Sequence, residues 1–332
     1  REMASTRYRV YQWLPLLEAR GIPFRVIRRR PHARSASSLL ARSRFLAQAL
    51  YYSRQYATVV CQKVVFEKAS LRRILRRRAR RLILDLDDAV HLTPSGEPAS
   101  LARVRAIEET VRMADRVVTG SLALANYCRS LGQSEVVVLP TSVDLANYPV
   151  KETAPEGALV TAGWVGSPGD LKFVEQLEPA LQEVSRVLGT RFRFLTVSSA
   201  PPAFVHGDWP HRFEPWALER EISCFQQLDI GIMPLPAENA RTRFKAGFKA
   251  IQYLASGIPA VVSPVGVNRE LVRPGTSGRW AQSPEEWTRA LLDLAASAEG
   301  RERMGRAGRE TVRQGYSVEA NGPGFLEAIC GT

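Results

Sequence analysis

One stretch of the sequence, residues 243–266, constrains the fold more than any other. It reads RFKAGFKAIQYLASGIPAVVSPVG and begins with two lysines, Lys245 and Lys249, that are four positions apart. The apolar residues that follow, among them Ile251 and Leu254, recur with the spacing of one helical face. The pattern therefore predicts a helix with one apolar side, preceded by a loop that carries positive charge.

The same stretch predicts how this helix ends. Gly257 is a typical helix terminator, and Pro259 keeps the helix from resuming. Residues 260–262, Ala-Val-Val, are strand formers and are followed by Ser263-Pro264. The order is thus loop, helix, tight turn, buried parallel strand and loop.

The start of the predicted helix is a candidate anion site. A helix N-terminus offers free backbone N–H groups and the positive end of the helix dipole. With Lys245 and Lys249 beside it, this end suits a diphosphate group. The alternative, a surface helix with solvated lysines, is equally compatible with this stretch alone.

The rest of the chain alternates between strand and helix patterns. The predicted strands are 24–27, 57–65, 82–90, 116–119, 135–139, 158–165, 192–197 and 230–233. The predicted helices are 6–20, 38–52, 71–82, 98–114, 121–131, 170–188 and 219–228, with a helical tail over 284–330 that breaks near Gly300, Gly315 and Gly322-Pro323. Such alternation predicts α/β architecture with doubly wound parallel sheets.

The length of 332 residues fits two domains, and residues 140–155, poor in periodic pattern, are the expected linker. Two parallel α/β units predict a cleft between them, with ligands at the carboxyl ends of strands. The chain opens almost directly with a helix, whereas doubly wound domains usually begin with a strand. We therefore expect a gap where a central strand should lie, with that strand either lacking or supplied by residues before Arg1.

Composition narrows the function classes. The four cysteines are far apart and form no CxxC pair, and the four histidines are scattered, which argues against a zinc site, a disulfide framework or a histidine metal cluster. This pattern and the lack of an apolar run of about 18 residues predict a cytoplasmic protein. The net charge of +13 indicates an anionic partner.

The positive charge is concentrated in residues 71–82, LRRILRRRARRL, which hold seven arginines. An apolar stripe, formed by Leu71, Ile74, Leu75, Ala79 and Leu82, is expected to pack on a sheet. The arginines are then either a solvated face or a surface that binds anionic lipid weakly. Nucleic acid is not the expected partner, because no aromatic residues interleave with these arginines.

Three further motifs carry candidate chemistry. Residues 163–170, GWVGSPGD, form a glycine turn between a strand and a helix, where backbone amides can approach a phosphate closely. Residues 85–91, DLDDAVH, lie at the end of a predicted strand, whose alternation puts Asp85 and Asp87 on one face and Asp88 on the other. Their carboxylates can orient hydroxyls, act as a base or hold a metal. Arg7 and Arg9 either face the cleft or are solvated. The alternatives for the first two motifs are an ordinary loop and helix capping.

These pieces together resemble the GT-B-fold nucleotide-sugar glycosyltransferases, specifically the retaining family 4. The matching segments are RYRVYQWLPLLEARGI, LDLDDAVH, ADRVVTGSLALANYCRSLG, VVVLPTSVDLANYP, GWVGSPGDLKFVEQL, LDIGIMPLP, FKAGFKAIQYLASGIPAVVSPVGVNRELV and GRERMGRAGRETV. They cover nearly the whole chain. The resemblance implies two Rossmann-like domains facing each other across a cleft.

The resemblance also implies that each domain binds a different substrate. Residues 1–147, completed by the last helix at 313–332, would bind the acceptor, and residues 148–312 would bind a UDP- or GDP-sugar without an obligatory metal. The acceptor, a glycan, a lipid-linked sugar or a small molecule, would lie by Asp87, Asp88 and His91. The implied donor-site residues are Gly166, Ser167, Lys172, Trp216, Arg243, Lys245, Gly247, Phe248, Lys249 and Gln252, with Lys249 also assigned to catalysis.

The chain departs from the family pattern at the donor site. Phe244 and Gln252 stand where many members carry two glutamates, and Ser167 stands where an arginine is common. Gln252 can still bond ribose hydroxyls through its amide, but without charge. Two other functions therefore stay open beside the transferase: a non-catalytic protein that binds sugar nucleotides or anionic surfaces, and a nucleotide-sugar epimerase.

Overall fold

The computed structural model describes residues 4–28, 36–204 and 209–331. The chain divides into two compact units. The N-terminal unit comprises Arg1–Thr93, Glu97–Pro140 and Gly322–Thr332, and the C-terminal unit comprises Pro94–Gly96 and Thr141–Asn321. Each is a parallel α/β domain, as the sequence predicted.

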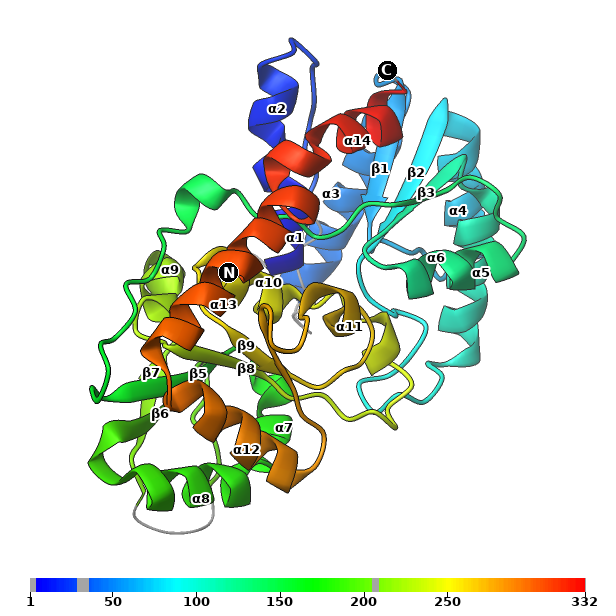
Figure 1. Ribbon diagram of the computed structural model, residues 1–332. Coiled ribbons are helices and arrows are strands. Elements are labelled where there is room, and N and C mark those ends of the chain that lie inside the picture. The colour runs from blue at the N-terminus through cyan, green and yellow to red at the C-terminus, as the bar shows by residue number, and fades with distance from the viewer. Residues whose placement is uncertain (1–3, 29–35, 205–208, 332) are drawn as a thin grey trace. The chain divides into compact units, whose positions relative to one another are not determined.

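The N-terminal unit is built on a four-stranded parallel sheet. Its strands follow the chain order and are β1 (Thr58–Gln62), β2 (Arg81–Leu86), β3 (Arg116–Thr119) and β4 (Val136–Val138). Its longer helices are α3 (Ala36–Tyr52), α4 (Ala69–Arg78), α5 (Leu101–Met113) and α6 (Leu122–Ser130) (Figure 1). Side chains of β2 that are almost fully buried, including Leu82, Leu84 and Leu86, make the core with α5.

Helix ends in this unit follow capping rules. The side chain of Ser100 accepts a hydrogen bond from the Arg103 backbone N–H at the start of α5, and Ser121 does the same for Leu124 at the start of α6. Each hydroxyl satisfies a backbone donor that has no partner within the helix. Both caps follow directly on the end of a strand or loop, so they fix where each crossover begins.

The first helix is broken, which corrects the expected helix over 6–20. It consists of α1 (Ala4–Arg9), a 3-10 turn (Tyr11–Trp13) and α2 (Leu14–Glu18), with Pro15 in the first turn of α2. Proline fits the first turn of a helix, where its missing N–H has no partner anyway. Trp13 and Leu17 are still buried, and Trp13 stacks on Phe325 with ring centroids 4.6 Å apart.

Residues 24–27 form no strand, which contradicts the sequence prediction. A strand needs a neighbour to pair with, and β1 pairs only with β2 within the part of the chain that the structure describes. Residues 22–28 and residues 57–64, which include β1, line the same cavity of about 1500 Å³. The segment predicted as a strand therefore faces this cavity and does not pair with β1. Backbone donors and acceptors on this edge of β1 therefore lie along an open slot.

The C-terminal unit is built on a six-stranded parallel sheet whose order is β10-β9-β8-β5-β6-β7. The strands are β5 (Val160–Val165), β6 (Phe192–Ser198), β7 (His211–Pro215), β8 (Ile230–Met233), β9 (Ala260–Val262) and β10 (Gly278–Trp280). The order reverses between β5 and β8, so this unit is doubly wound. Ligands of such sheets bind at the reversal, beyond the carboxyl ends of the strands.

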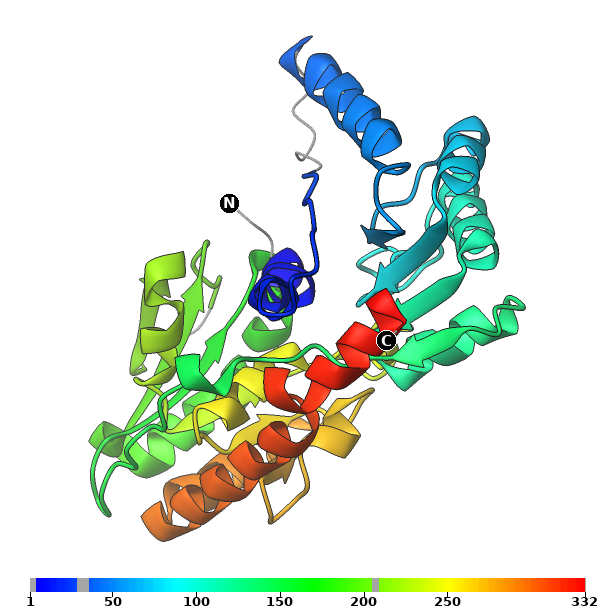
Figure 2. The ribbon, with the colours of Figure 1, turned by 90° about the horizontal axis from the view of Figure 1, so that it is seen from above.

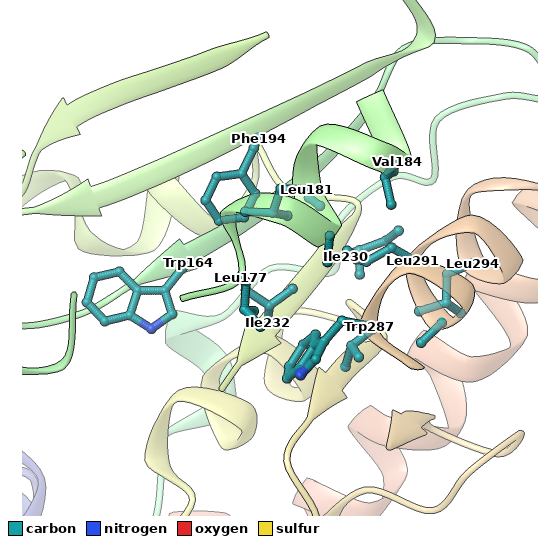
Figure 3. Packing of buried hydrophobic residues seen from close by; sticks show 14 of the residues in the cluster. Trp164, Leu177, Leu181, Val184, Phe194, Ile230, Ile232, Trp287, Leu291 and Leu294 are labelled. Carbon is teal, nitrogen blue, oxygen red and sulfur yellow. The ribbon is translucent and has the colours of Figure 1, made fainter. Parts of the chain in front are cut away.

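Helices cover both faces of this sheet. On one face, α8 (Glu178–Leu188) and α12 (Pro284–Ala295) pack against residues such as Trp164, Ile230 and Ile232. Figure 3 shows this cluster, in which Trp287 of α12 and Leu177 point toward the strands. Seven of the ten labelled residues belong to α8, α12 or β8, so this packing fixes β8 beside β5.

The other face is covered by α9 (Glu221–Phe225) and α10 (Phe248–Ala255). A side chain at Gly231 would overlap the ring of Tyr253, so this glycine lets α10 approach the sheet. The Tyr253 hydroxyl donates to the Ile232 carbonyl and accepts from the Val165 N–H at 3.1 Å, while the same burial raises the pKa of this tyrosine above its ordinary value. This side chain ties α10 to the carboxyl ends of β5 and β8.

The tail consists of α12, α13 (Ala298–Gly315) and α14 (Val318–Cys330). Helix α13, orange in Figures 1 and 2, packs on α10, where a side chain at Gly305 would overlap the Gly257 carbonyl. The expected break near Gly300 shifts to residues 296–297, and the one near Gly315 is present. The expected break at Gly322-Pro323 is wrong, because α14 continues through it and buries Phe325 and Leu326.

Other element boundaries also needed tertiary information. The predicted helix over 170–188 is split into α7 (Leu171–Glu175) and α8, and Pro179 stands in the first turn of α8. The helix predicted over 71–82 ends at Arg78, because Arg81 and Leu82 belong to β2. The strand predicted over 82–90 ends at Leu86. The short strands β7 and β10 were not predicted.

No helix among the described residues is long and apolar enough to cross a membrane.

Candidate active site

The reversal point of the C-terminal sheet gathers the candidate donor-site residues. Strand β5 ends at Val165 and leads into the loop that begins with Gly166, while β8 ends at Met233 and is followed by α10. Because β5 and β8 are neighbours, their carboxyl ends and the residues that follow lie at one edge of the sheet. Lys245 and Lys249 reach this edge from the segment that starts α10.

Both lysines bind one carboxylate. The Lys245 ammonium lies 3.1 Å from each carboxylate oxygen of Asp170, and the Lys249 ammonium lies 2.9 Å from Oδ2 of the same residue. Asp170 ends the 3-10 turn (Pro168–Asp170) that follows the Gly166 loop. The two cations therefore converge on one anionic group at the place where a phosphate was expected.

Partial burial makes this cluster electrostatically strong. The side chains of Asp170, Lys245 and Lys249 are 19%, 25% and 16% exposed. Burial by itself raises the pKa of Asp170, but Lys249 and Lys245 outweigh it and hold this pKa well below its ordinary value. Burial lowers the pKa of Lys249, and Asp170 opposes that shift. Without an anion between them, the two ammonium groups would repel each other.

Gly166 allows this arrangement because it has no side chain. A Cβ atom there would overlap both Cε of Lys249 and the ring of Trp164. The Lys249 ammonium in turn lies 5.2 Å from the centroid of the Trp164 ring, a cation–π distance. Gly166 was expected to let a ligand approach closely, and the side chain that packs against it is Lys249.

Gly247 and Phe248 begin α10. Gly247 has φ 68°, in the left-handed region that a residue with a side chain rarely adopts, and it is the N-cap of the helix. Its conformation turns the chain from Lys245 into α10, so that Lys249 lies in the first turn. Phe248 is half-buried at the first helical position.

The two positions that depart from the family pattern lie in different surroundings. Phe244 is buried, and the Arg243 guanidinium lies over its ring at 4.6 Å. Gln252 is also buried, and its amide donates to the hydroxyl of Tyr148 at 3.0 Å. Gln252 lies one turn beyond Lys249 in α10, so an amide and a phenol are close to the lysine cluster.

Of the other predicted donor-site residues, Ser167 adjoins the lysine cluster, because its carbonyl accepts the Asp170 backbone N–H at 3.1 Å. Ser167 and Lys172 are exposed, and the Lys172 ammonium lies over the ring of its neighbour Phe173. Trp216 follows β7, and its backbone N–H donates to the Ser198 carbonyl at 2.8 Å. Since β7 is two strand positions from β5, Trp216 lies roughly 10 Å along the same edge.

The N-terminal unit has its own polar cluster at the carboxyl ends of β1 and β2. Arg9 is buried, and its Nε and Nη2 donate hydrogen bonds to the two carboxylate oxygens of Asp85. Its remaining nitrogen, Nη1, donates to the Leu139 carbonyl at 2.6 Å. Burial works against the charge of Arg9, but Asp85 raises its pKa further above the ordinary value. Arg9 is therefore a structural ion-pair partner, not a solvated side chain.

The predicted acceptor-site residues lie beside this pair. Asp87 forms an ion pair with the Lys63 ammonium at 2.7 Å, and the Asp88 carboxylate accepts a hydrogen bond from the backbone N–H of Ala89 at 2.8 Å. His91 is buried and stacks on Tyr127 with ring centroids 4.0 Å apart. Asp85 and Asp87 were expected on one face of a strand, but the strand ends between them and they take different partners.

The described residues contain no group of histidine, cysteine, aspartate or glutamate side chains able to hold a metal ion. Sequence reasoning missed two charged residues that complete the clusters. Asp170 closes the glycine-loop motif that was quoted, so its position was a usable signal. Lys63 gave no signal, since nothing in the sequence indicates that it meets Asp87.

The fold and these clusters define a GT-B protein. Comparison with known proteins agrees with this class: residues 161–297 match the family model described as "Glycosyl transferases group 1". None of the curated protein sequences matches the chain.

Several solved structures share the fold. Anabaena HepE, determined in complex with UDP and glucose, is 15% identical, with a TM-score of 0.68 over 97% of this chain and 89% of that one. Sucrose-phosphate synthase from Thermosynechococcus elongatus is also 15% identical, with a TM-score of 0.66 over 90% and 79%. A glycosyltransferase from Rickettsia africae is 11% identical, with a TM-score of 0.63 over 95% and 86%. The expected resemblance to GT-B glycosyltransferases is thus confirmed.

Proposed function

We propose that this protein is a retaining glycosyltransferase of the hexosyltransferase type, which moves a sugar from a UDP- or GDP-sugar to a glycan, lipid-linked or small-molecule acceptor. The observation that carries the proposal is the convergence of Lys245 and Lys249 beside Gly166, at the reversal point of the C-terminal sheet. The group 1 match over residues 161–297 supports a transferase at this place.

The lysine cluster suits a diphosphate leaving group. Two ammonium groups that already share a carboxylate can hold a phosphate in the same way, and the first N–H groups of α10 add donors. Negative charge on the diphosphate grows as the sugar departs, so these contacts strengthen in the transition state. In this proposal the lysines supply the positive charge, and no divalent metal is required.

The remaining donor-site residues have matching chemistry. Gln252 and Tyr148 present an amide and a hydroxyl one turn from Lys249, and we assign the ribose to them. The edge between β6 and β7, near Trp216, would hold the base. Structures of HepE with UDP and glucose and with UDP-glucose support a nucleotide-sugar donor for this fold.

The proposed reaction retains the configuration of the sugar. The bond from the anomeric carbon to the phosphate oxygen breaks, and the acceptor oxygen bonds to the same face of that carbon. The acceptor proton passes to the departing phosphate, so no covalent intermediate with the protein is needed. Asp87 and Asp88, in the N-terminal unit, would orient the acceptor hydroxyl, while His91 is buried under Tyr127 and would act by packing.

The experiment is a comparison of donor turnover in matched variants. Wild-type protein is tested for hydrolysis of, and thermal stabilisation by, a panel of UDP- and GDP-sugars. We expect Lys245→Ala and Lys249→Ala to lose roughly 10²-fold in turnover, as for a single electrostatic donor elsewhere. Arg186→Ala, which removes an exposed cation of the same unit, is the control. If both lysine variants keep wild-type kinetics, the assignment is wrong.

A second function, a protein that binds nucleotide sugars without turning them over, is favoured by one observation. Phe244 and Gln252 are buried at the positions where many family members have glutamates, so no carboxylate reaches the donor from these two places. The same panel separates the functions. Thermal stabilisation by a nucleotide sugar without hydrolysis or transfer would indicate the binding protein.

We also propose a cytoplasmic location with weak binding to anionic membranes through α4. Of the seven arginines in residues 71–82, Arg73 and Arg77 of α4 and Arg80, two residues beyond its end, are exposed, and we call these three the α4 surface arginines. The others have protein partners: Arg72 pairs with Glu109 and Arg76 with Asp115. The expected apolar stripe is also incomplete, because Ile74 is 39% exposed.

A further inference from the structure

The backbone of Lys63 is unusual. It has φ 54°, and it is the one residue other than glycine with positive φ in the part of the chain that the structure describes. A side chain in this left-handed conformation costs about 1 kcal/mol or more, and such residues concentrate at functional sites. The surroundings of Lys63 must therefore stabilise this conformation.

The position of Lys63 shows what the conformation achieves. Strand β1 ends at Gln62, which is in register with Asp85 of β2, and the Lys63 N–H donates to the Asp85 carbonyl at 2.9 Å. One residue beyond the strand, the turn directs the Lys63 side chain to Asp87, which follows the end of β2. Its ammonium lies 2.7 Å from Oδ1 of Asp87, with side chains 21% and 11% exposed.

The carboxylates of Asp85, Asp87 and Asp88, at the carboxyl end of β2, differ in their hydrogen-bond partners. Both oxygens of Asp85 are bound by Arg9, and Oδ1 of Asp88 accepts the N–H of Ala89. On Asp87, Lys63 and the Gln62 amide, at 3.5 Å, both lie at Oδ1. Among the described residues none donates a hydrogen bond to its Oδ2. Asp87 is thus held at one oxygen and open at the other.

We propose that Lys63 is a positioning residue for the acceptor: its ammonium fixes Oδ1 of Asp87 and favours the charged carboxylate, so that Oδ2 can accept a hydrogen bond from the attacking hydroxyl. The inference rests on the proposed glycosyl transfer and adds a residue to its acceptor site. Lys63 itself need not touch the acceptor. It acts through Asp87.

The charges around Asp87 agree with this role. The pKa of Asp87 lies above its ordinary value, because burial and the neighbouring carboxylate of Asp85 raise it more than Lys63 and, more weakly, Arg9 lower it. Lys63 thus limits the rise. Lys63 is the nearest of these cations, and the charge of Arg9 is already matched by Asp85. Removing the Lys63 charge leaves burial largely unopposed, so the pKa of Asp87 rises and its charged form is lost at higher pH.

The first test measures this ionisation without any enzyme activity. The protein is labelled with carboxyl-¹³C aspartate, the Asp87 signal is assigned by its loss in Asp87→Asn, and it is titrated in wild type, Lys63→Met and Lys63→Arg. We expect the midpoint to rise by about one pH unit or more in Lys63→Met and to stay near wild type in Lys63→Arg. Lys63→Gly, which fits positive φ, repeats the loss of charge if Lys63→Met does not fold. An unmoved midpoint in the folded uncharged variant overturns the proposal.

The second test uses UDP-glucose with glycerol as the acceptor probe. We expect the acid limb of kcat/KM for glycerol to move to higher pH in Lys63→Met, to be restored in Lys63→Arg and to vanish in Asp87→Asn, with the KM for UDP-glucose unchanged. A limb that does not move in Lys63→Met also overturns the proposal. If the wild type transfers nothing to any acceptor, the proposed function fails instead, and the titration of Asp87 still decides the role of Lys63.

Discussion

Replacing Asp170 with asparagine tests how the donor site is held before a ligand arrives. In the free protein the Asp170 carboxylate occupies both lysines that we assign to the diphosphate. A bound diphosphate must take over these ammonium groups, so it competes with Asp170. We therefore expect Asp170→Asn to lower the stability of the free protein and to raise its affinity for diphosphates.

The size of the effect follows from the contacts. A hydrogen bond to a charged group contributes about 1.5–3 kcal/mol, and removing one partner of a fully buried pair costs about 3–5 kcal/mol. These side chains are 16–25% exposed, so solvent screens part of the interaction. We expect a loss of about 2 kcal/mol in the free energy of unfolding. If most of this loss is confined to the free state, affinity rises about tenfold, which corresponds to about 1.4 kcal/mol.

The assay combines denaturant unfolding with calorimetric titration by inorganic diphosphate and by UDP. Glu183→Gln, which removes an exposed carboxylate of the same unit, is the control. The pKa of Asp170 is lowered in the folded protein, so its stabilising contribution is present above the ordinary carboxyl pKa of about 3.9 and is lost as the pH falls below that value. The stability difference between wild type and variant is therefore expected at neutral pH and should shrink in acid.

A weaker affinity of Asp170→Asn for diphosphate would refute this reasoning. It would mean that Asp170 orients the lysines in the bound state as well, instead of competing with the ligand. Equal stability of the two proteins at neutral pH would show that the ion pairs contribute nothing measurable, and the expected gain in affinity would lose its basis.

Three further predictions follow from the same structure. Gly166→Ala places a methyl group against Lys249 and the ring of Trp164, so we expect a loss of about 1–3 kcal/mol in unfolding experiments and weaker UDP binding, whereas Gly169→Ala, which meets no atom within 4 Å, should change neither. NMR of the transfer product is expected to show the anomer of the donor sugar, and an inverted linkage would contradict the mechanism. Replacing the three α4 surface arginines with alanine should abolish co-sedimentation with anionic vesicles at low salt, since each contributes about 1 kcal/mol, and wild-type binding that is equal on neutral vesicles would leave these arginines as a solvated face.

Local sequence determined the elements whose signals lie within a few residues. Lys245 and Lys249 are four positions apart, so a short turn and one helical turn bring both to the same anion, and Gly257 ends α10 as expected. The buried strands β3, β8 and β9 were predicted within a residue, because continuous apolar runs between turn signals leave few alternatives. The alternation of these elements predicted two doubly wound α/β units, and the resemblance of the motifs to known glycosyltransferases added the GT-B architecture.

Only the tertiary structure decided which charges meet. Asp170 is 75 and 79 positions from its two lysines, and Arg9 is 76 positions from Asp85, so these pairs depend on strand order and not on local pattern. The left-handed turn at Lys63 and the unformed strand at 24–27 also depend on what lies beside β1. The sequence by itself determined most of the buried strands and longer helices and the glycine loop after β5. The ionic partners at the candidate site were decided by packing, because electrostatic contacts act through space between residues remote in the chain.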